Sequence, residues 1–306
     1  MEDPMTLYSN KTHLSYLGLY HLPENVIILY VALISSTFCL YIPSIIIILS
    51  VIFTTAHIRE NVRYVLFCHM LFSDSLQLTI AFFLFIVTSY NLLMPMKWCC
   101  AISGIGASTA LITPYNLALM SLERYIAVCF PLRHGEICTV WRCKVAIMGM
   151  WVIGAFPVLI ELAILCYFMN SNFFSFQMLC IWKYLQIYNV QITIRFLTSS
   201  LSFSSMLLII FYTYIRVIIA ARKIKSKKSS ASKAAKTVLL HAFQLLLCLC
   251  SYSSTFTETL FNNQYMNMAP INFFVFMCLP QYISPFIYGI RDELIWKSIR
   301  KLICST

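Results

Sequence analysis

The sequence predicts an all-α integral membrane protein with seven membrane-spanning helices, and three observations lead to this prediction. Of the 306 residues, 60% are hydrophobic and only 11% are charged, whereas soluble domains carry about 25% charged residues. Seven apolar runs are each long enough to cross a bilayer as a helix, which takes about 20 residues. The positive charges gather beside one set of helix ends, as on the cytoplasmic side of membrane proteins.

Backbone groups in lipid must bond within their own segment, so these runs are expected to be helices. The short alternating segments of a β-barrel are absent. The expected organisation is an extracellular N-terminus over residues 1–25, a seven-transmembrane domain over 26–290, and a cytoplasmic tail over 291–306 whose apolar and charged faces predict an amphipathic helix along the membrane. The seven predicted spans are 26–53, 61–88, 97–129, 144–168, 190–220, 236–259 and 268–290.

The distribution of Lys and Arg predicts the orientation. With the N-terminus outside, 18 of the 22 lie in inner segments, and four lie outside: Lys11, Lys97, Lys183 and Arg195. The expected location is the plasma membrane, where this collar faces anionic lipid headgroups and an intracellular partner. The net charge of +11 therefore does not indicate nucleic acid. Asn10 begins an Asn-Lys-Thr glycosylation sequon on the predicted outer side.

The sequence has no pattern typical of a soluble enzyme. It has no Gly-rich phosphate loop and no HExxH or GxSxG motif. The six histidines form no helical ligand pairs, and the thirteen cysteines lack metal-site spacing. We therefore expect no catalytic residues, no cofactor and no metal, and interpret each histidine as a boundary or packing residue.

The most specific motif is Glu123-Arg124-Tyr125 at the inner end of the third span. Asp74 is a lone carboxylate in the second span, a costly location that signals function. With Trp151 early in the fourth span and Ser284-Pro285-Phe286-Ile287-Tyr288 in the seventh, the pattern resembles rhodopsin-like (class A) G protein-coupled receptors. Within that family the chain resembles odorant receptors, especially those of fish, over four segments: 61–67, 130–134, 233–241 and 280–291.

The resemblance implies a disulfide from Cys99, at the outer end of the third span, to the second outer loop. Cys180 is the better placed partner, and both Cys99 and Cys180 lie on the predicted oxidising side. Cys100 and Cys166 are rivals. Cys304 is a candidate for palmitoylation, with an unmodified thiol as the alternative.

The chain departs from the family's pattern in three segments. Pro43-Ser44 stands where Gly-Asn is usual, and Cys248-Leu249-Cys250 replaces an FYG triplet. Thr113 stands where mammalian odorant receptors commonly carry an acid, which argues against a sodium site around Asp74.

The resemblance places a ligand pocket in the outer half of the bundle. Small residues, hydroxyls and aromatic walls make a concave apolar site with few polar groups, although helix packing explains each candidate equally well. The candidates are Gly106, Ala107, Ala110, Thr198, Ser199, Ser202, Tyr252 and Phe256. Arg195 is a further candidate, to bind an acidic odorant such as an amino acid or bile acid. Pairing with Glu161 or Glu258, or snorkelling to the interface, is the favoured alternative.

The activation machinery follows from the same motifs. No Asp or Glu lies between Glu161 and Glu258, so Glu123 alone is expected to hold Arg124, helped by hydrogen bonds from residues 237–241. The aromatic partners of the open state are expected to be Tyr214 and Tyr288. The residues assigned to coupling and activation are Asp74, Glu123, Arg124, Tyr125, Tyr214, His241, Pro285 and Tyr288.

The predicted function is an odorant receptor that binds a small molecule and activates a heterotrimeric G protein of the olfactory stimulatory type, which raises cyclic AMP. The alternative is a class A receptor for a non-odorant ligand. Gly106 stands where amine receptors carry Asp, and residues 268–290 hold no lysine for retinal. A transporter or channel would predict half-repeats and several buried charges at mid-membrane, whereas only Asp74 is expected to be buried.

Overall fold

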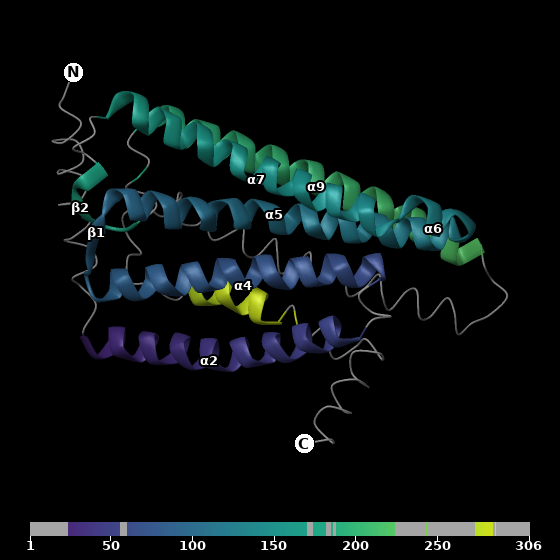
Figure 1. The fold of residues 1–306 in the computed structure, drawn as a ribbon, viewed down its shortest axis with the longest axis horizontal. Helices are drawn as coiled ribbons and strands as arrows, with labels where there is room; N and C mark the ends of the chain where they lie inside the picture. Colours follow the sequence, from purple (N-terminus) through teal and green to yellow (C-terminus); the bar gives the residue numbers. More distant parts are fainter. Residues whose placement is uncertain are drawn as a thin grey trace.

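The structure is a computed structural model that describes residues 24–55, 60–169, 174–181, 185, 188–223, 243, 273–283 and 285. Five long helices lie side by side in it (Figure 1), and each is long and apolar enough to cross a membrane. These helices are α2 (Glu24–Thr54), α4 (Val62–Ser89), α5 (Met96–Cys129), α7 (Val140–Phe168) and α9 (Asn189–Lys223). The shorter elements are β1 (Leu93–Pro95), η1 (Pro131–Arg133), α6 (His134–Ile137), β2 (Gln177–Leu179) and η4, a π-helix (Phe273–Cys278).

The first five predicted spans are confirmed, with ends within four residues of the observed ones. Residues 273–283, within the seventh predicted span, are helical as well. The sixth predicted span, 236–259, lies outside the described residues except for Phe243. Residues 1–23 and 291–306 also lie outside them, and with them Asn10, Cys304 and the predicted amphipathic helix.

Helix α5 is the centre of the described bundle. It packs against α4, α7 and α9 (Figure 1), whereas α2 packs against the far side of α4. Residues on every side of α5 are buried, among them Cys99, Ile112 and Leu117. The helical residues 273–283, which begin with η4, join the core at α2 and α4. There the rings of Tyr41 and Tyr282 meet edge to face with centroids 5.1 Å apart. A change in any outer helix therefore reaches the others mainly through α5.

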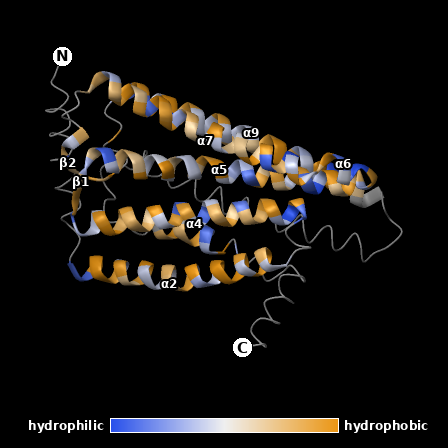
Figure 2. Ribbon diagram, in the orientation of Figure 1, coloured by the Kyte–Doolittle hydropathy of each residue, from blue (hydrophilic) through white to orange (hydrophobic). Residues whose placement is uncertain are grey.

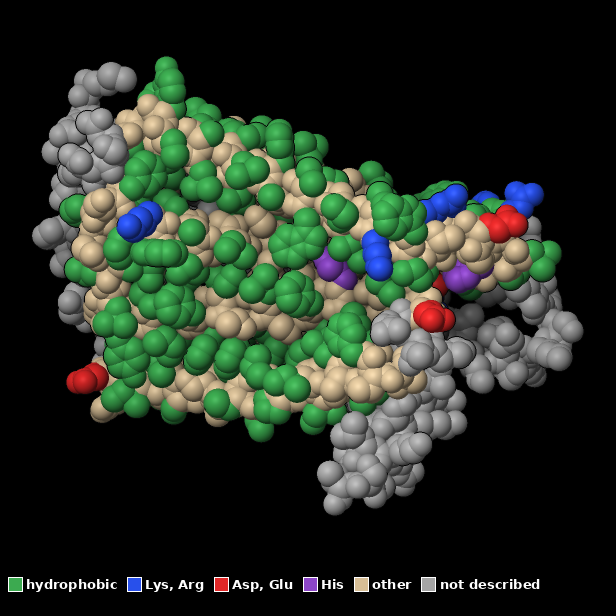
Figure 3. Space-filling view, in the orientation of Figure 1, with side chains coloured by type: hydrophobic (Ala, Val, Ile, Leu, Met, Phe, Trp, Pro, Cys, Tyr) green, Lys and Arg blue, Asp and Glu red, His purple; other side chains and the backbone are tan. Residues whose placement is uncertain are grey.

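The surface of these helices suits lipid. Apolar residues run along the length of each helix (Figure 2), and charged side chains lie mostly toward the two ends of the bundle in the face shown in Figure 3. Hydroxyl groups within the spans bond to their own backbone: Ser36 donates to the carbonyl of Leu33 at 2.8 Å, and Thr54 to that of Ser50 at 2.8 Å. Each of these bonds pairs a hydroxyl proton that would otherwise face hydrocarbon.

Among the five long helices of the described part, three contain a proline inside the helix: Pro43 in α2, Pro114 in α5 and Pro157 in α7. Proline lacks the N–H that would bond one turn back, and spanning helices tolerate it where neighbouring groups compensate. Next to Pro43, the Ser44 hydroxyl donates to the carbonyl of Tyr41 at 2.6 Å. The Pro43-Ser44 pair is thus accommodated without ending the helix.

Helices α5 and α7 approach each other closely at Gly154. A Cβ atom at this position would lie 2.9 Å from Ile112 Cγ1 and 2.9 Å from the carbonyl oxygen of Ser108. Real Cβ atoms essentially never come this close to another heavy atom. The absence of a side chain at Gly154 therefore sets the spacing of the two helices.

We expect Gly154→Ala to destabilise the bundle, because the added methyl group must push α7 away from α5. Overpacking of this kind costs about 1–3 kcal/mol, which predicts a melting temperature several degrees lower for the purified protein in detergent. Gly149→Ala is the matched control, since nothing lies within 4 Å of a Cβ at that exposed position of the same helix. Equal melting temperatures for the two variants would contradict the close approach.

Candidate functional site

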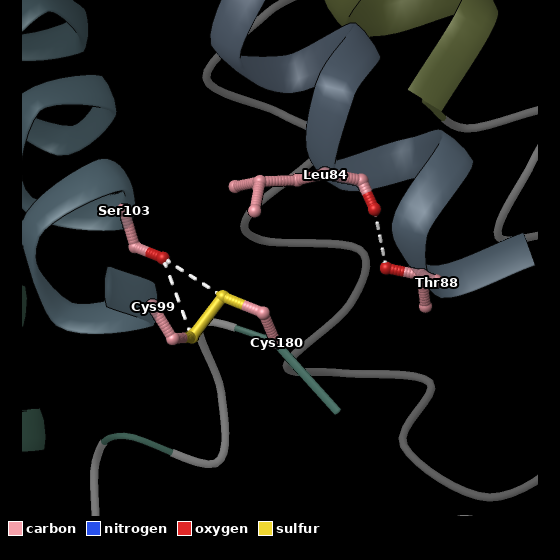
Figure 4. The surroundings of a disulfide bond; sticks show 5 residues. All are labelled: Leu84, Thr88, Cys99, Ser103 and Cys180. Carbon is pink, nitrogen blue, oxygen red and sulfur yellow. Dashed lines mark hydrogen bonds between the residues drawn. A yellow bond between two sulfur atoms is a disulfide. The ribbon is translucent and has the colours of Figure 1, made fainter. Parts of the chain in front are cut away.

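A disulfide holds one end of the bundle together. Cys99, in the first turn of α5, is bonded to Cys180, with Cα atoms 5.4 Å apart, and the Ser103 hydroxyl lies beside both sulfurs (Figure 4). Antiparallel pairing of β1 with β2 brings the two cysteines together, since Leu93 lies opposite Leu179 in the register. The predicted pairing is confirmed, and the rival Cys100 and Cys166 are free thiols.

An ion pair joins α7 to α9 in the half of the bundle nearer this disulfide. The Arg195 Nε donates to Glu161 Oε1 at 3.1 Å, and Glu161 is only 4% exposed. The neighbouring Gln191 side chain, also buried, donates to the backbone carbonyl of Glu161 at 3.2 Å and accepts from the backbone N–H of Tyr188 at 3.1 Å. Of the partners considered for Arg195, the structure has Glu161; Glu258 lies outside the described residues.

The hydroxyl candidates of α9 share the inward face with Arg195. Burial recurs at Gln191, Ser202 and Met206, and Arg195 is partly buried on the same stripe. Ser202 accepts a hydrogen bond from the Tyr115 hydroxyl of α5 at 2.8 Å. The Thr198 hydroxyl donates to the carbonyls of Ile194, at 2.8 Å, and of Arg195, at 3.1 Å. Ser199 is partly buried beside them.

The candidate ligand-binding residues of α5 are Gly106, Ala107 and Ala110, which lie on a partly buried face of the helix. A Cβ at Gly106 would lie 3.0 Å from Ile80 Cγ2 of α4, so this glycine serves helix packing. Ala107 and Ala110 are half-buried. The two aromatic candidates, Tyr252 and Phe256, lie outside the described residues.

Asp74 is buried between α4 and α5, at 2% exposure. The Thr113 hydroxyl donates to Asp74 Oδ1 at 2.9 Å, so the residue that replaces the family's acid is a hydrogen-bond partner of this carboxyl. About one turn closer to the Glu123 end of the bundle, the Trp151 indole N–H donates to His69 Nε2 at 3.0 Å and links α7 to α4. His69 and Trp151 thus form a polar joint that the sequence analysis did not identify.

At the opposite end of the bundle, Glu123 binds two groups at once. Its Oε2 lies 3.5 Å from Arg124 Nε, and its Oε1 lies 3.2 Å from His134 Nε2. Glu123 is 7% exposed. His134 begins α6, the short helix between α5 and α7. The expected pairing of Glu123 with Arg124 is therefore present. The second partner is His134, whose sequence context predicts only a boundary or packing role. Residues 237–241 lie outside the described part.

The remaining activation candidates that the structure describes are Tyr125, Tyr214 and Pro285. The Tyr125 ring meets Phe130 and Tyr212 edge to face, with centroids 5.8 Å and 6.1 Å away. Tyr214 packs, partly buried, against the main core cluster, and Pro285 is buried. His241 and Tyr288 lie outside the described residues.

The expectation that Asp74 is the only buried charge is wrong, because Glu123 and Glu161 are also buried. Neither lies at the middle of its span: Glu123 is near the end of α5, and Glu161 is within two turns of the end of α7. The burial of Glu161 has a signal in the sequence. It falls in step with Gly154, Pro157, Val158 and Leu165, the inward stripe of α7.

These features define a multi-pass α-helical membrane protein with a disulfide at one end, a buried carboxylate–arginine pair at the other, and polar joints between. Residues 45–288 match the 7 transmembrane receptor (rhodopsin family). The chain belongs to this family, which is one of receptors and not of enzymes.

Its relatives include receptors named for odorants. "Odorant receptor 131-2" of Danio rerio is 28% identical over 256 residues, which cover 79% of this chain and 76% of that protein. "Olfactory receptor 1E2" of Gorilla gorilla gorilla is 24% identical over 62% of this chain and 62% of its own length. "Olfactory receptor 5AK2" of Homo sapiens is 22% identical over 61% of this chain and 62% of its own length.

We expect Thr113→Val to destabilise the receptor by about 1–3 kcal/mol, because it leaves the buried Asp74 carboxyl without this donor. Thr109→Val is the matched control: Thr109 is also buried, but its hydroxyl bonds only to backbone carbonyls of its own helix. Thermal unfolding in detergent measures the difference. A control variant as unstable as Thr113→Val would show that the Asp74 bond contributes little.

Proposed function

We propose that this chain is an odorant receptor of the plasma membrane, with its N-terminus outside and its C-terminus in the cytoplasm. It binds a small molecule in the outer half of the bundle and activates a heterotrimeric G protein of the olfactory stimulatory type, which raises cyclic AMP. The observation that carries the proposal is the likeness of 79% of the chain to a protein named as an odorant receptor. The excess of Lys and Arg beside the Glu123 end supports this orientation.

The ligand site in this proposal lies between α5 and α9, on the side of the disulfide, with the sixth and seventh spans completing it. Its residues are Gly106, Ala107, Ala110, Arg195, Thr198, Ser199, Ser202, Tyr252 and Phe256. Among the described ones, Arg195 and Ser202 already bond to side chains of other helices. A ligand that exchanges with these bonds would change how α9 sits against α5 and α7.

Activation requires that the ligand favour the active conformation over the resting one. In the resting arrangement Glu123 neutralises Arg124 and also holds His134 at the start of α6. A G protein that engages α6 would draw His134 away and weaken the hold on Arg124. The same carboxylate thus connects the inner loop with the arginine of the motif.

The test of the proposed function is a cyclic AMP assay in cells that express the chain with the olfactory stimulatory G protein. The cells are challenged with pools of amino acids, bile acids, amines, steroids and volatile organic compounds. Arg124→Gln, with verified surface expression, is the control. A response that this variant loses would support the proposal. A response that persists in it, or silence of a wild-type chain at the surface, would contradict it.

Glu123→Gln is expected to raise agonist-independent cyclic AMP several-fold. The amide retains the shape but loses the charge attraction to Arg124, and charged hydrogen bonds are stronger than neutral ones by about 1 kcal/mol. Glu136→Gln is the matched control, since Glu136 is exposed on α6 and its contact with Arg142 uses the backbone carbonyl. Unchanged basal signalling in Glu123→Gln, at equal surface expression, would refute this role.

His134→Phe separates the two contacts of Glu123. It removes the bond to α6 and leaves the ion pair with Arg124 in place. We expect basal cyclic AMP to rise, but less than in Glu123→Gln, because one of the two restraints remains. A rise equal to or greater than that of Glu123→Gln would mean that His134, and not the charge on Glu123, dominates the hold.

A further inference from the structure

The Glu161–Arg195 pair is not explained by stability. Removing two charges from water costs more than their attraction returns in many buried pairs, and apolar residues of similar size often serve as well. The two helices also have a neutral link at the same level, from Gln191 to the carbonyl of Glu161. Charged residues within spanning helices are rare and usually functional. The pair therefore calls for a role beyond joining α7 to α9.

Both charges lie on the inward faces of their helices. Glu161 follows the buried stripe of α7, and Arg195 lies between the buried Gln191 and Ser202 on α9. The exposed residues next to them, such as Leu159 and Phe196, point the other way. Arg195 is six residues inside the end of α9, about 9 Å. The pair thus belongs to the interior of the bundle at the depth proposed for the ligand.

We propose that this ion pair is the recognition site for a zwitterionic ligand, one that carries both a carboxylate and an ammonium group, such as an amino acid. The carboxylate binds Arg195 and the ammonium binds Glu161, in place of their bond to each other. This inference rests on the proposed function, because it names the class of small molecule that the receptor binds.

Charge balance is the physical reason for this selectivity. When an acid with no amine takes Arg195, it leaves Glu161 buried with no cation. An amine with no acid leaves the partly buried Arg195 without its Glu161 partner. An uncompensated buried charge is strongly unfavourable, so each exchange works against binding. A zwitterion breaks one ion pair and forms two, which leaves all four charges paired. We expect it to bind about a hundredfold more tightly than either singly charged analogue.

A matched ligand series tests the inference directly. The purified full chain in lipid nanodiscs is heated with common α- and ω-amino acids, with the amide of each, and with each acid lacking the amine. Binding to the folded state raises the melting temperature. At least one amino acid is expected to do so at millimolar concentration, while its amide and its deaminated acid do not. Equal effects of an analogue, or no shift with any amino acid, would overturn the inference.

Charge variants then separate recognition from helix packing. Glu161→Gln and Arg195→Gln should each lose the shift caused by the amino acid. The double variant Glu161→Arg with Arg195→Glu keeps an ion pair between α7 and α9, so a structural role would keep both stability and binding. If the pair recognises the ligand, the double variant should remain stable but lose amino-acid binding. The positions that bind the carboxylate and the ammonium group are exchanged in it, while the rest of the ligand site is unchanged. Thr193→Val, on the exposed face of α9, is the control that keeps binding.

The outcomes distinguish the inference from the proposed function. A non-zwitterionic odorant whose signal is lost in Arg124→Gln but kept in both single charge variants would overturn the inference and leave the receptor function standing. Amino-acid binding without any G protein response would support the inference and contradict the proposed signalling. The ligand series on the wild-type chain decides the matter even where a variant fails to fold.

Discussion

The structure depends on one constraint: the hydrocarbon region of a membrane offers no water to a polar group. Every backbone bond must be made inside the segment, which is why the described spans are long helices. The same constraint turns serine and threonine hydroxyls back onto their own carbonyls, as at Ser36 and Thr54. It also allows Pro43 inside α2, where the Ser44 hydroxyl bonds to the backbone close to the break.

Side chains that the backbone cannot satisfy become specific joints between helices. Asp74 bonds to a hydroxyl of α5, Glu161 to a guanidinium of α9, and Glu123 to an imidazole of α6. Apolar contacts between helices in lipid can slide with little change in energy, because lipid tails are as apolar as leucine. A carboxylate that bonds to one group of the neighbouring helix cannot slide in this way, because the movement would break its bond. The three acids thus define the positions of the helices along one another. A sliding movement between two helices would break the bond of the acid that joins them.

The membrane-spanning helices were predictable from the sequence, because the length and hydropathy of a segment and the distribution of its flanking charges are determined by the bilayer. The five described long spans and the disulfide partner of Cys99 followed from such signals or from the resemblance. The partner of Glu123 did not: His134 reaches it only through the local path of η1 and α6. The pairing of Arg195 with Glu161 depends on how α7 and α9 are rotated about their axes, which composition alone does not encode. The His69–Trp151 bond depends on the same rotation.

Gly154 carries a consequence for sequence divergence. One of the two atoms that crowd it belongs to the Ile112 side chain, and a smaller residue there would make room for a methyl group. The other is the Ser108 carbonyl oxygen, which every residue type possesses. No second substitution can therefore compensate at that contact. Related chains that keep this pairing of the third and fourth spans should show glycine at this position without covariation, whereas the contact does not require isoleucine at position 112.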